Sequence, residues 1–327
     1  MNRVIVSGIQ PSGKLHIGNY LGMLSNAVKL QDEYHCYYFV ADMHSLTENY
    51  RPQDKPQQIL DAVMDLLALG VDPEKSVIFI QSQVPEHAEL AWYFNTITPI
   101  ASLERMTQYK DKTGRQKENI NVGLFDYPVL QAADILLYQP YGVPVGEDQL
   151  QHLELTNDIA KKFNSKFGQT FLLIKPLLTS TPRVMSLLQP TKKMSKSLGE
   201  GHVININDNA KTIEKKLARA ITDTGKEKKM TPGVKNLFLL LEIFGEPEQY
   251  KFYLEAHHQG SIRYADLKAN LAKVIAHHFA PYRERRLKFA QKTEYIKEVL
   301  TAGRQKAKAL ASQTLREVKK KMGLLIS

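Results

Sequence analysis

The sequence predicts an α/β fold built on a doubly wound parallel sheet, with a C-terminal all-helical domain. Three short apolar stretches, at residues 4–7, 36–41 and 76–80, have the length and composition of buried strands. Helical stretches at residues 56–68 and 86–96 alternate with them, and this alternation is typical of parallel sheets. After residue 197 the pattern is helical throughout. We therefore expect ligands at the carboxyl ends of the strands, where such sheets bind them.

The residues after the first strand predict a turn that leads into a helix. Residues 17–30 carry apolar side chains at helical spacing. At a strand–turn–helix junction, free backbone N–H groups and the positive end of the helix dipole attract an anion. The turn itself is indicated by small and rigid residues, which are Gly8, Pro11, Ser12 and Gly13.

Three residues at the start of that helix are suited to a nucleotide. His16 and Asn19 are three residues apart on one helix face, where both can donate to phosphate oxygens. Gly18 has no Cβ, so a base or ribose can lie flat against the helix. An ordinary βα turn with a solvated histidine is the alternative interpretation, because short motifs also occur by chance.

A later segment carries two lysines around a small polar stretch. Lys193 and Lys196 flank Met194 and Ser195, and Ser197 follows. Two ammonium groups on a flexible loop suit negative charge that develops during a displacement at phosphorus. A solvated face or a nucleic-acid patch is the alternative for the lysines taken alone.

Two further segments place polar groups beside apolar ones. Asp134 lies within the apolar residues 127–138, where a carboxylate needs a partner, either inside the fold or on a ligand. A second set of polar residues follows the apolar residues 143–145. Its carboxylate and amide oxygens can accept hydrogen bonds from ribose hydroxyls or from an ammonium group. A helix N-cap at Asp148 and a solvated turn are the alternatives for this second group, which consists of Gly146, Glu147, Asp148 and Gln149.

Five of these segments together resemble the bacterial-type tryptophanyl-tRNA synthetases, class I enzymes that share a group with the tyrosine enzymes. They occur in family order and span essentially the whole chain, at residues 7–13, 16–19, 132–138, 144–149 and 193–197. The resemblance implies a Rossmann-type catalytic domain. It also implies in-line attack of tryptophan on the α-phosphate of ATP, which gives tryptophanyl-adenylate and pyrophosphate. Transfer of tryptophan to the terminal ribose of tRNA(Trp) would follow.

The resemblance also implies roles for individual residues. Catalytic roles fall to His16, Asn19, Lys193, Lys196 and, less directly, Lys112. No covalent nucleophile or general base is required, because the substrate carboxylate is already a nucleophile. Mg²⁺ bridging the phosphates is implied, although no protein cage for it is evident. The ATP-binding set is Gln10, Pro11, Ser12, Gly18, Asn19, Gly146, Glu147, Asp148, Val184, Lys193, Met194, Ser195, Lys196 and Ser197.

The tryptophan-binding set follows from the same resemblance. Asp134 accepts from the indole N–H, and Tyr127 and Gln149 hold the amino group. The remaining members are Val6, Gln131 and His44. His44 is included because it follows the second strand, at the end where such sheets bind ligands. A polar strand-end cap is nearly as good an interpretation of His44. Gln131 stands where many relatives carry methionine, and this departure bears on the packing of the pocket.

Two of these residues favour tryptophan over tyrosine. The tyrosine enzymes place a tyrosine at the position of Val6 to bond the phenol, whereas valine leaves room for a bicyclic ring. The carboxylate of Asp134 only accepts, which suits an indole N–H that only donates. A tyrosyl-specific relative is the nearer alternative. The farther one is a noncatalytic tRNA-binding protein of the same fold.

Composition and charge set further bounds. Hydrophobic content of 43% and charged content of 24% are typical of soluble globular proteins, and the apolar run at residues 237–241 is too short for a bilayer. The start of the chain lacks secretory features, so a cytoplasmic location is expected. The single cysteine, Cys36, excludes an internal disulfide and is expected to be buried.

A net charge of +10 favours a polyanionic partner, although a lysine-rich solvated helix face is an equal alternative. With the resemblance, it points to tRNA. The basic residues concerned are Arg283, Arg285, Arg286, Lys288, Arg304, Lys306, Lys308 and residues 319–321.

The expected domains are a catalytic domain over residues 1–186 and a lysine-loop plus helical anticodon-binding domain over 187–327. By resemblance, the last helix, about 290–327, packs back on the first domain, and the chain forms a homodimer.

Overall fold

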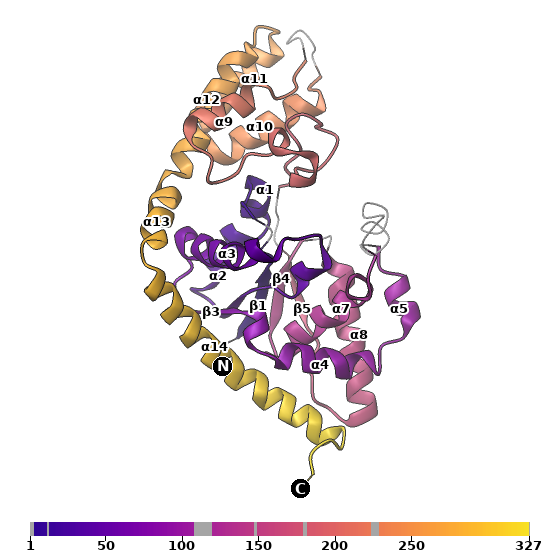
Figure 1. The fold of residues 1–327 in the computed structure, drawn as a ribbon. Helices are drawn as coiled ribbons and strands as arrows, with labels where there is room; N and C mark the ends of the chain where they lie inside the picture. Colours follow the sequence, from indigo (N-terminus) through magenta and orange to yellow (C-terminus); the bar gives the residue numbers. More distant parts are fainter. Residues whose placement is uncertain are drawn as a thin grey trace. The chain divides into compact units, whose positions relative to one another are not determined.

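The computed structural model describes residues 3–11, 13–107, 120–146, 149–178, 182–223 and 229–326. The chain divides into two compact units (Figure 1). The first comprises Met1–Gly13, Asn26–Ser180 and Phe289–Ser327, and the second comprises Lys14–Ser25 and Thr181–Lys288. Residues 14–25 therefore join the helical unit, and the end of the chain joins the α/β unit. The functional division at residue 186 stays a prediction.

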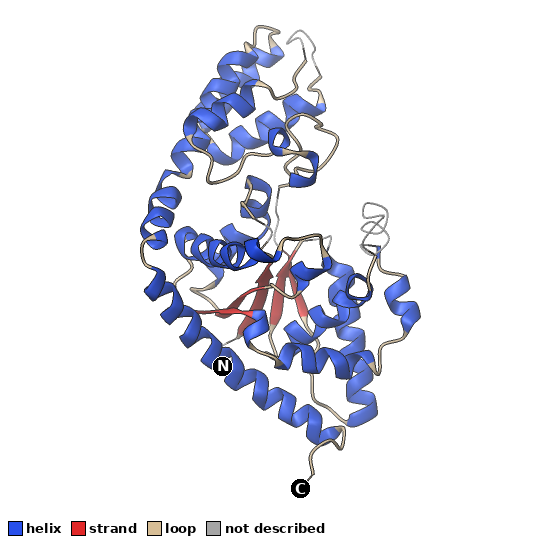
Figure 2. Cartoon of the chain, in the orientation of Figure 1, coloured by secondary structure: helices blue, strands red, loops and turns tan. Residues whose placement is uncertain are grey.

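A parallel sheet of five strands forms the centre of the first unit (Figure 2). The strand order is β3-β2-β1-β4-β5, which reverses direction between β1 and β4 as in doubly wound folds. The fold-class prediction is confirmed. The strands are β1 (Val4–Ile9), β2 (His35–Val40), β3 (Ser76–Ile80), β4 (Gly142–Val145) and β5 (Lys175–Leu178).

The strands of the first unit follow the sequence pattern except at one edge. Buried aromatic and β-branched residues fill β2 and β3, and Cys36 is buried in β2 as predicted. The sequence pattern does not indicate β5, which is short, largely exposed and interrupted by Pro176. Proline lacks the N–H that a central strand needs, so β5 is tolerated because it lies at the edge of the sheet.

Helices cover the sheet, and one of them, α7, carries half of the predicted tryptophan-binding residues. Two of them, α3 and α4, coincide with the predicted helices to within a residue. The core between sheet and helices includes Val6, Phe39, Phe79, Ala133 and Leu315. The helices are α2 (Ser25–Leu30), α3 (Lys55–Leu69), α4 (Glu86–Asn95), α5 (Ile100–Glu104), α7 (Val122–Leu136), α8 (Leu150–Phe167) and α14 (Thr293–Lys321).

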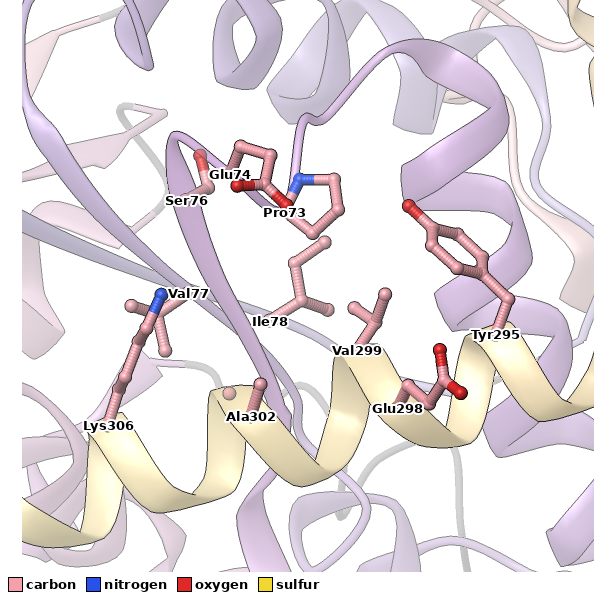
Figure 3. A pocket seen from close by; sticks show the side chains of 11 residues that line it. Pro73, Glu74, Ser76, Val77, Ile78, Tyr295, Glu298, Val299, Ala302 and Lys306 are labelled. Atoms are coloured by element: carbon pink, nitrogen blue, oxygen red, sulfur yellow. The ribbon is translucent and has the colours of Figure 1, made fainter.

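The long helix α14 lies against the edge strand β3 and covers it, as Figure 3 shows. The approach is very close at Gly303, where an added Cβ would lie 1.8 Å from the carbonyl oxygen of Ile78. Beside this contact is a cavity of about 220 Å³, whose walls include Tyr295, Val299 and Lys306 of α14. Covering an edge strand in this way removes a site for unwanted strand pairing.

Replacing Gly303 with alanine is expected to destabilise the protein by about 1–3 kcal/mol, because the new methyl group would force α14 away from β3. Denaturant unfolding would measure the loss. Gln305→Ala is the matched control, since Gln305 is an exposed residue of the same helix. Equal stability of Gly303→Ala and the native protein would contradict the close packing.

The second unit is helical, and its first helix differs from the prediction. The expected continuous helix over residues 17–30 is wrong, because a π-helical turn, η1 (Tyr20–Leu24), separates α1 (Ile17–Asn19) from α2. Such turns widen the hydrogen-bonding pattern and often occur at functional sites. The other helices are α9 (Ala210–Ala218), α10 (Pro232–Phe244), α11 (Pro247–His258), α12 (Tyr264–His278) and most of α13 (Ala280–Ala290).

The core of the second unit includes an apolar stripe at helical spacing on α12 and the residue after it. Leu267, Leu271, Ile275 and Phe279 are all buried, and Val274 is half-buried. Among the residues that the structure describes, no helix combines the length and apolar character needed to cross a bilayer.

Candidate active site

The predicted phosphate-binding turn is held in the second unit by backbone pairing. His16 pairs with Asn205 in a short antiparallel bridge, and the N–H of Ile17 donates to the carbonyl oxygen of Ile204 at 3.0 Å. The N–H of His16, the N-cap of α1, donates to Oδ1 of Asn19 at 3.1 Å, so the asparagine at the third helical position forms the capping-box contact back to the N-cap. This local bond fixes the Asn19 amide, whose other end remains a donor.

The lysine segment of the same unit begins from another short ladder. Lys193 pairs with Met185, and the N–H of Met194 donates to the carbonyl oxygen of Val184 at 3.0 Å. Asn236 of α10 binds both main-chain groups of Met185, at 2.8 and 2.9 Å. The start of the lysine segment is therefore fixed by a side chain that the sequence analysis did not identify.

The central part of the lysine segment is a short helical turn. Ser195 is the N-cap of the 3₁₀ turn η6 (Lys196–Leu198), and its hydroxyl accepts from the N–H of Ser197 at 3.4 Å. Met194 is buried, whereas Lys193 is exposed and Lys196 is half-buried. The lysine segment thus carries an ammonium group on either side of the buried side chain of Met194.

Electrostatics connect the two segments at His16. Burial, together with the positive charges of Lys196 and Lys193, lowers the pKa of His16 to about 4. The imidazole is therefore neutral at neutral pH, with one donor and one acceptor nitrogen. Its Nδ1 is buried and has no hydrogen-bond partner among the described residues. A neutral donor between two lysines suits phosphate oxygens better than proton transfer.

Gly18 makes room for this histidine. A Cβ on Gly18 would lie 3.0 Å from the imidazole ring of His16 and 4.0 Å from Cβ of Met194. The absent side chain therefore serves the packing of His16. The predicted contact of a nucleotide with Gly18 stays a prediction.

The lowered pKa of His16 predicts a pH dependence. The imidazole should stay neutral down to about pH 4, whereas a histidine in the unfolded chain takes up a proton near 6.5. The contribution of His16 to stability is therefore complete above pH 6.5 and is lost as the pH falls toward 4. Proton NMR of the imidazole would follow the titration, with the urea-unfolded protein as control. A midpoint above 6 in the folded protein would contradict the burial beside two cations.

The predicted carboxylate lies at the centre of a buried network in the first unit. Asp134 of α7 is 1% exposed. Its Oδ2 lies 2.7 Å from Nε2 of His44, and its Oδ1 lies 2.7 Å from Nε2 of Gln81 and 2.6 Å from Nδ1 of His87. The other nitrogen of His87 lies 2.8 Å from the hydroxyl of Tyr138. We call these five residues the Asp134 network.

Burial acts to raise the pKa of the Asp134 carboxyl, but His44 and His87 oppose it and hold the pKa at about 2. Asp134 is therefore ionised at neutral pH, and it can only accept hydrogen bonds. The network thus provides a permanent acceptor inside an apolar helix.

A cavity of about 320 Å³ adjoins this network in the first unit. His44 belongs to both, because it lines the cavity and bonds Asp134. Tyr127 also lines the cavity, and its hydroxyl lies 2.9 Å from Nε2 of His152. Burial raises the pKa of Tyr127 to about 12. The other lining residues are Met43, Leu46, Thr47, Asn121, Gly123, Asp126 and Leu130.

The remaining predicted residues fall into three groups. Val6 is buried in the core, Gln131 is half-buried on α7, and Gln149 precedes α8, but none of them lines this cavity. Gln10 and Pro11 follow β1, and Gly146 follows β4, as expected of strand-end ligands. Four predicted residues lie outside the described part of the chain, namely Ser12, Lys112, Glu147 and Asp148.

Sequence reasoning did not identify Gln81 and His87. Gln81 directly follows β3, so the rule that ligands bind at the carboxyl ends of parallel strands applied to it as it did to His44. His87 lies in the first turn of α4, where the sequence carries no signal that separates it from an ordinary helix residue.

The comparisons with known proteins agree with this geometry. A sequence model described as "tRNA synthetases class I (W and Y)" matches residues 2–280. The chain belongs to this family. It is an aminoacyl-tRNA synthetase, and the resemblance to the bacterial-type tryptophanyl enzymes is confirmed.

Relatives of this synthetase cover its full length. The tryptophan–tRNA ligase of Rickettsia bellii is 42% identical over 333 residues, with 100% of each chain covered. The tryptophanyl-tRNA synthetase structure from Mycoplasma pneumoniae has a TM-score of 0.87 at 36% identity and covers 99% of each chain. The Campylobacter jejuni enzyme complexed with ADP and tryptophan has the same TM-score at 34% identity, with 98% of this chain and 100% of that chain covered.

Proposed function

We propose that this synthetase activates L-tryptophan with ATP and transfers it to the 3′-terminal ribose of tRNA(Trp). The observation that carries the proposal is the Asp134 network. A buried, ionised acceptor beside an apolar cavity fits an indole N–H, which donates one hydrogen bond and accepts none. The bacterial relatives, which are tryptophan–tRNA ligases, support the same substrate.

The proposed first step joins the tryptophan carboxylate to the α-phosphorus of ATP. A carboxylate oxygen forms the new P–O bond, and the bond to the bridging oxygen of pyrophosphate breaks in line with it. Negative charge grows on the departing pyrophosphate, and we assign its stabilisation to the ammonium groups of Lys193 and Lys196. We assign to the neutral His16 the role of a hydrogen-bond donor to a phosphate oxygen, because attack by the substrate carboxylate requires no proton transfer.

Mg²⁺ accompanies the nucleotide in this proposal but is given no protein cage. Within the described residues, no cluster of three or more His, Cys, Asp or Glu side chains could hold a metal ion. The groups near His16 are cations, which fit phosphate oxygens and not a metal. We therefore assign phosphate binding to the protein and derive no step through the metal.

Binding of tRNA(Trp) is proposed for the basic helical part of the chain, but not all predicted residues are available for it. Nζ of Lys319 lies 2.8 Å from Glu89, Lys321 bonds to Gln169, and Arg283 donates to the carbonyl of Ala276. These contacts join α14 to α4 and to the loop after α8, and α13 to α12. The exposed residues Arg304, Lys306 and Lys308 of α14 and Lys288 of α13 are the better candidates for phosphate contacts.

Assembly and location stay proposals as well. A homodimer is expected from the resemblance, and exposed apolar residues such as Trp92 of α4 and Ile100 of α5 are suited to an interface. Sedimentation velocity would test this, and a monomer at micromolar concentration would contradict it. The expected location is the cytoplasm.

ATP–pyrophosphate exchange with each aromatic amino acid tests the proposed activation step. We expect exchange with tryptophan and little with tyrosine or phenylalanine, followed by charging of a tRNA(Trp) transcript. Exchange that prefers tyrosine would instead assign the chain to the tyrosyl branch of the family. Absence of exchange with every aromatic amino acid would contradict activation altogether.

A further inference from the structure

The two oxygens of Asp134 have different surroundings. Oδ1 accepts from Gln81 and from His87, at 2.7 and 2.6 Å. A carboxylate oxygen has two lone pairs, so these two donors complete Oδ1. Among the described residues, Oδ2 has a single partner, Nε2 of His44 at 2.7 Å. One acceptor position therefore remains on Oδ2, the oxygen that bonds to the cavity-lining residue His44.

The direction of the hydrogen bonds at His87 follows from the same geometry. Because Asp134 only accepts, Nδ1 of His87 must carry the proton that it shares with Oδ1. Nε2 of His87 then accepts from the hydroxyl of Tyr138, a buried donor with no other acceptor among the described residues. The bonds run in one direction, from Tyr138 through His87 to Asp134, and they fix the imidazole tautomer.

His87 cannot touch a substrate, because it is completely buried and packs among the rings of Phe39, Phe79 and Tyr138. Gln81 is also completely buried. Neither side chain can therefore meet a ligand directly. Gln81 accepts from the N–H of Met43 at 3.2 Å, and both Gln81 and His87 donate to Asp134. Their donors fix the rotation of the carboxylate about its Cβ–Cγ bond, which decides where Oδ2 points.

We propose that His87 and Gln81 are positioning residues that occupy Oδ1 of Asp134 and thereby reserve Oδ2 for the indole N–H of tryptophan. This inference rests on the proposed function, in which Asp134 recognises the indole. It assigns recognition of the indole to Oδ2 of Asp134. The orientation of that oxygen would be set by His87 and Gln81, which do not contact the ligand.

The test compares tryptophan with 3-(3-benzothienyl)alanine, in which sulfur replaces the N–H and removes the donor. ATP–pyrophosphate exchange with the full-length enzyme gives kcat/KM for each amino acid, and their ratio measures recognition of the N–H alone. A variant that merely loosens the fold lowers both values and leaves the ratio unchanged. The ratio is therefore the decisive readout.

A matched pair of substitutions probes His87. The amide nitrogen of asparagine takes approximately the place of Nδ1, whereas that of glutamine takes approximately the place of Nε2. His87→Gln is expected to lower the ratio roughly 10- to 100-fold, the value of a hydrogen bond to a charged group. His87→Asn should retain most of the ratio. An unchanged ratio in His87→Gln, or an equal loss in both variants, would overturn the role of Nδ1.

Gln81→Met provides a second route that does not depend on the folding of the His87 variants. It removes the other donor to Oδ1 at nearly constant side-chain length and should also lower the ratio. Gln83→Met is its control, because Gln83 is an exposed residue of the same 3₁₀ turn, η4 (Gln81–Gln83). A ratio that stays at the native value in Gln81→Met would count against the proposal.

The native enzyme separates failure of this inference from failure of the proposed function. Native enzyme that does not activate tryptophan would contradict the function itself. Equal kcat/KM for tryptophan and the sulfur analogue would remove Asp134 as the indole acceptor. Clear preference for tryptophan, with ratios unchanged in His87→Gln and Gln81→Met, would overturn only the positioning roles.

Discussion

Replacing Asp134 with alanine should reduce kcat/KM for tryptophan activation by roughly 10⁴-fold, with little change in ATP affinity. The substitution removes the acceptor and leaves three buried donors, those of His44, Gln81 and His87, without their partner. ATP affinity should persist because none of the residues assigned to ATP binding belongs to the Asp134 network. Exchange kinetics against tryptophan concentration would measure the first effect, and calorimetric ATP binding the second.

Two further variants separate recognition from folding. Asp134→Asn keeps the shape of the side chain, but its amide N–H faces donors, so we expect a loss close to that of alanine. Asp65→Asn removes another buried carboxylate of the first unit, on α3 and outside the Asp134 network, and should leave tryptophan activation unchanged. Full activity in both Asp134 variants would show that the pocket assignment is wrong.

The sheet and the central carboxylate could be predicted because both follow from local pattern. Short buried strands and alternating helices specify β1, β2 and β3, and an acid in an apolar helix demands a partner. The partners themselves could not be predicted. Gln81 and His87 reach Asp134 across 53 and 47 residues of sequence, and nothing in the surrounding residues of His87 indicates that contact.

The division of the chain was also beyond local pattern. Residues 14–25 lie between two strands in the sequence, yet they join the helical unit. The cause is long-range backbone pairing, in which Ile17 donates to Ile204 and Ile206 donates to Leu15. The π-helical turn at Tyr20–Leu24 comes next in the sequence. The spacing of apolar residues cannot distinguish such a turn from an α-helix. The local residue pattern therefore located the turn that is predicted to bind phosphate, but not the structural unit that holds it.

Lys196 is the residue for which the second large effect is expected. Lys196→Ala should slow adenylate formation by roughly 10²- to 10³-fold while ATP affinity changes little. The charge of Lys196 already acts on the turn that is predicted to bind phosphate, since it lowers the pKa of His16 more than Lys193 does. The positive charge of Lys196 should stabilise the transition state, in which negative charge grows on the departing pyrophosphate, more than it stabilises bound ATP before the reaction. Single-turnover measurements over a range of ATP concentrations separate the two contributions.

Lys192→Ala is the matched control for this prediction. Lys192 is an exposed lysine in the same segment, but it is not among the groups that lower the pKa of His16. Loss of Lys196 should therefore raise the pKa of His16 as well as slow the reaction, whereas loss of Lys192 should do neither. If Lys196→Ala raised only the KM for ATP and left the rate at saturation intact, the lysine would serve ground-state binding. If Lys196→Ala slowed the reaction but left the pKa of His16 unchanged, Lys196 would act on the reaction at a position away from His16.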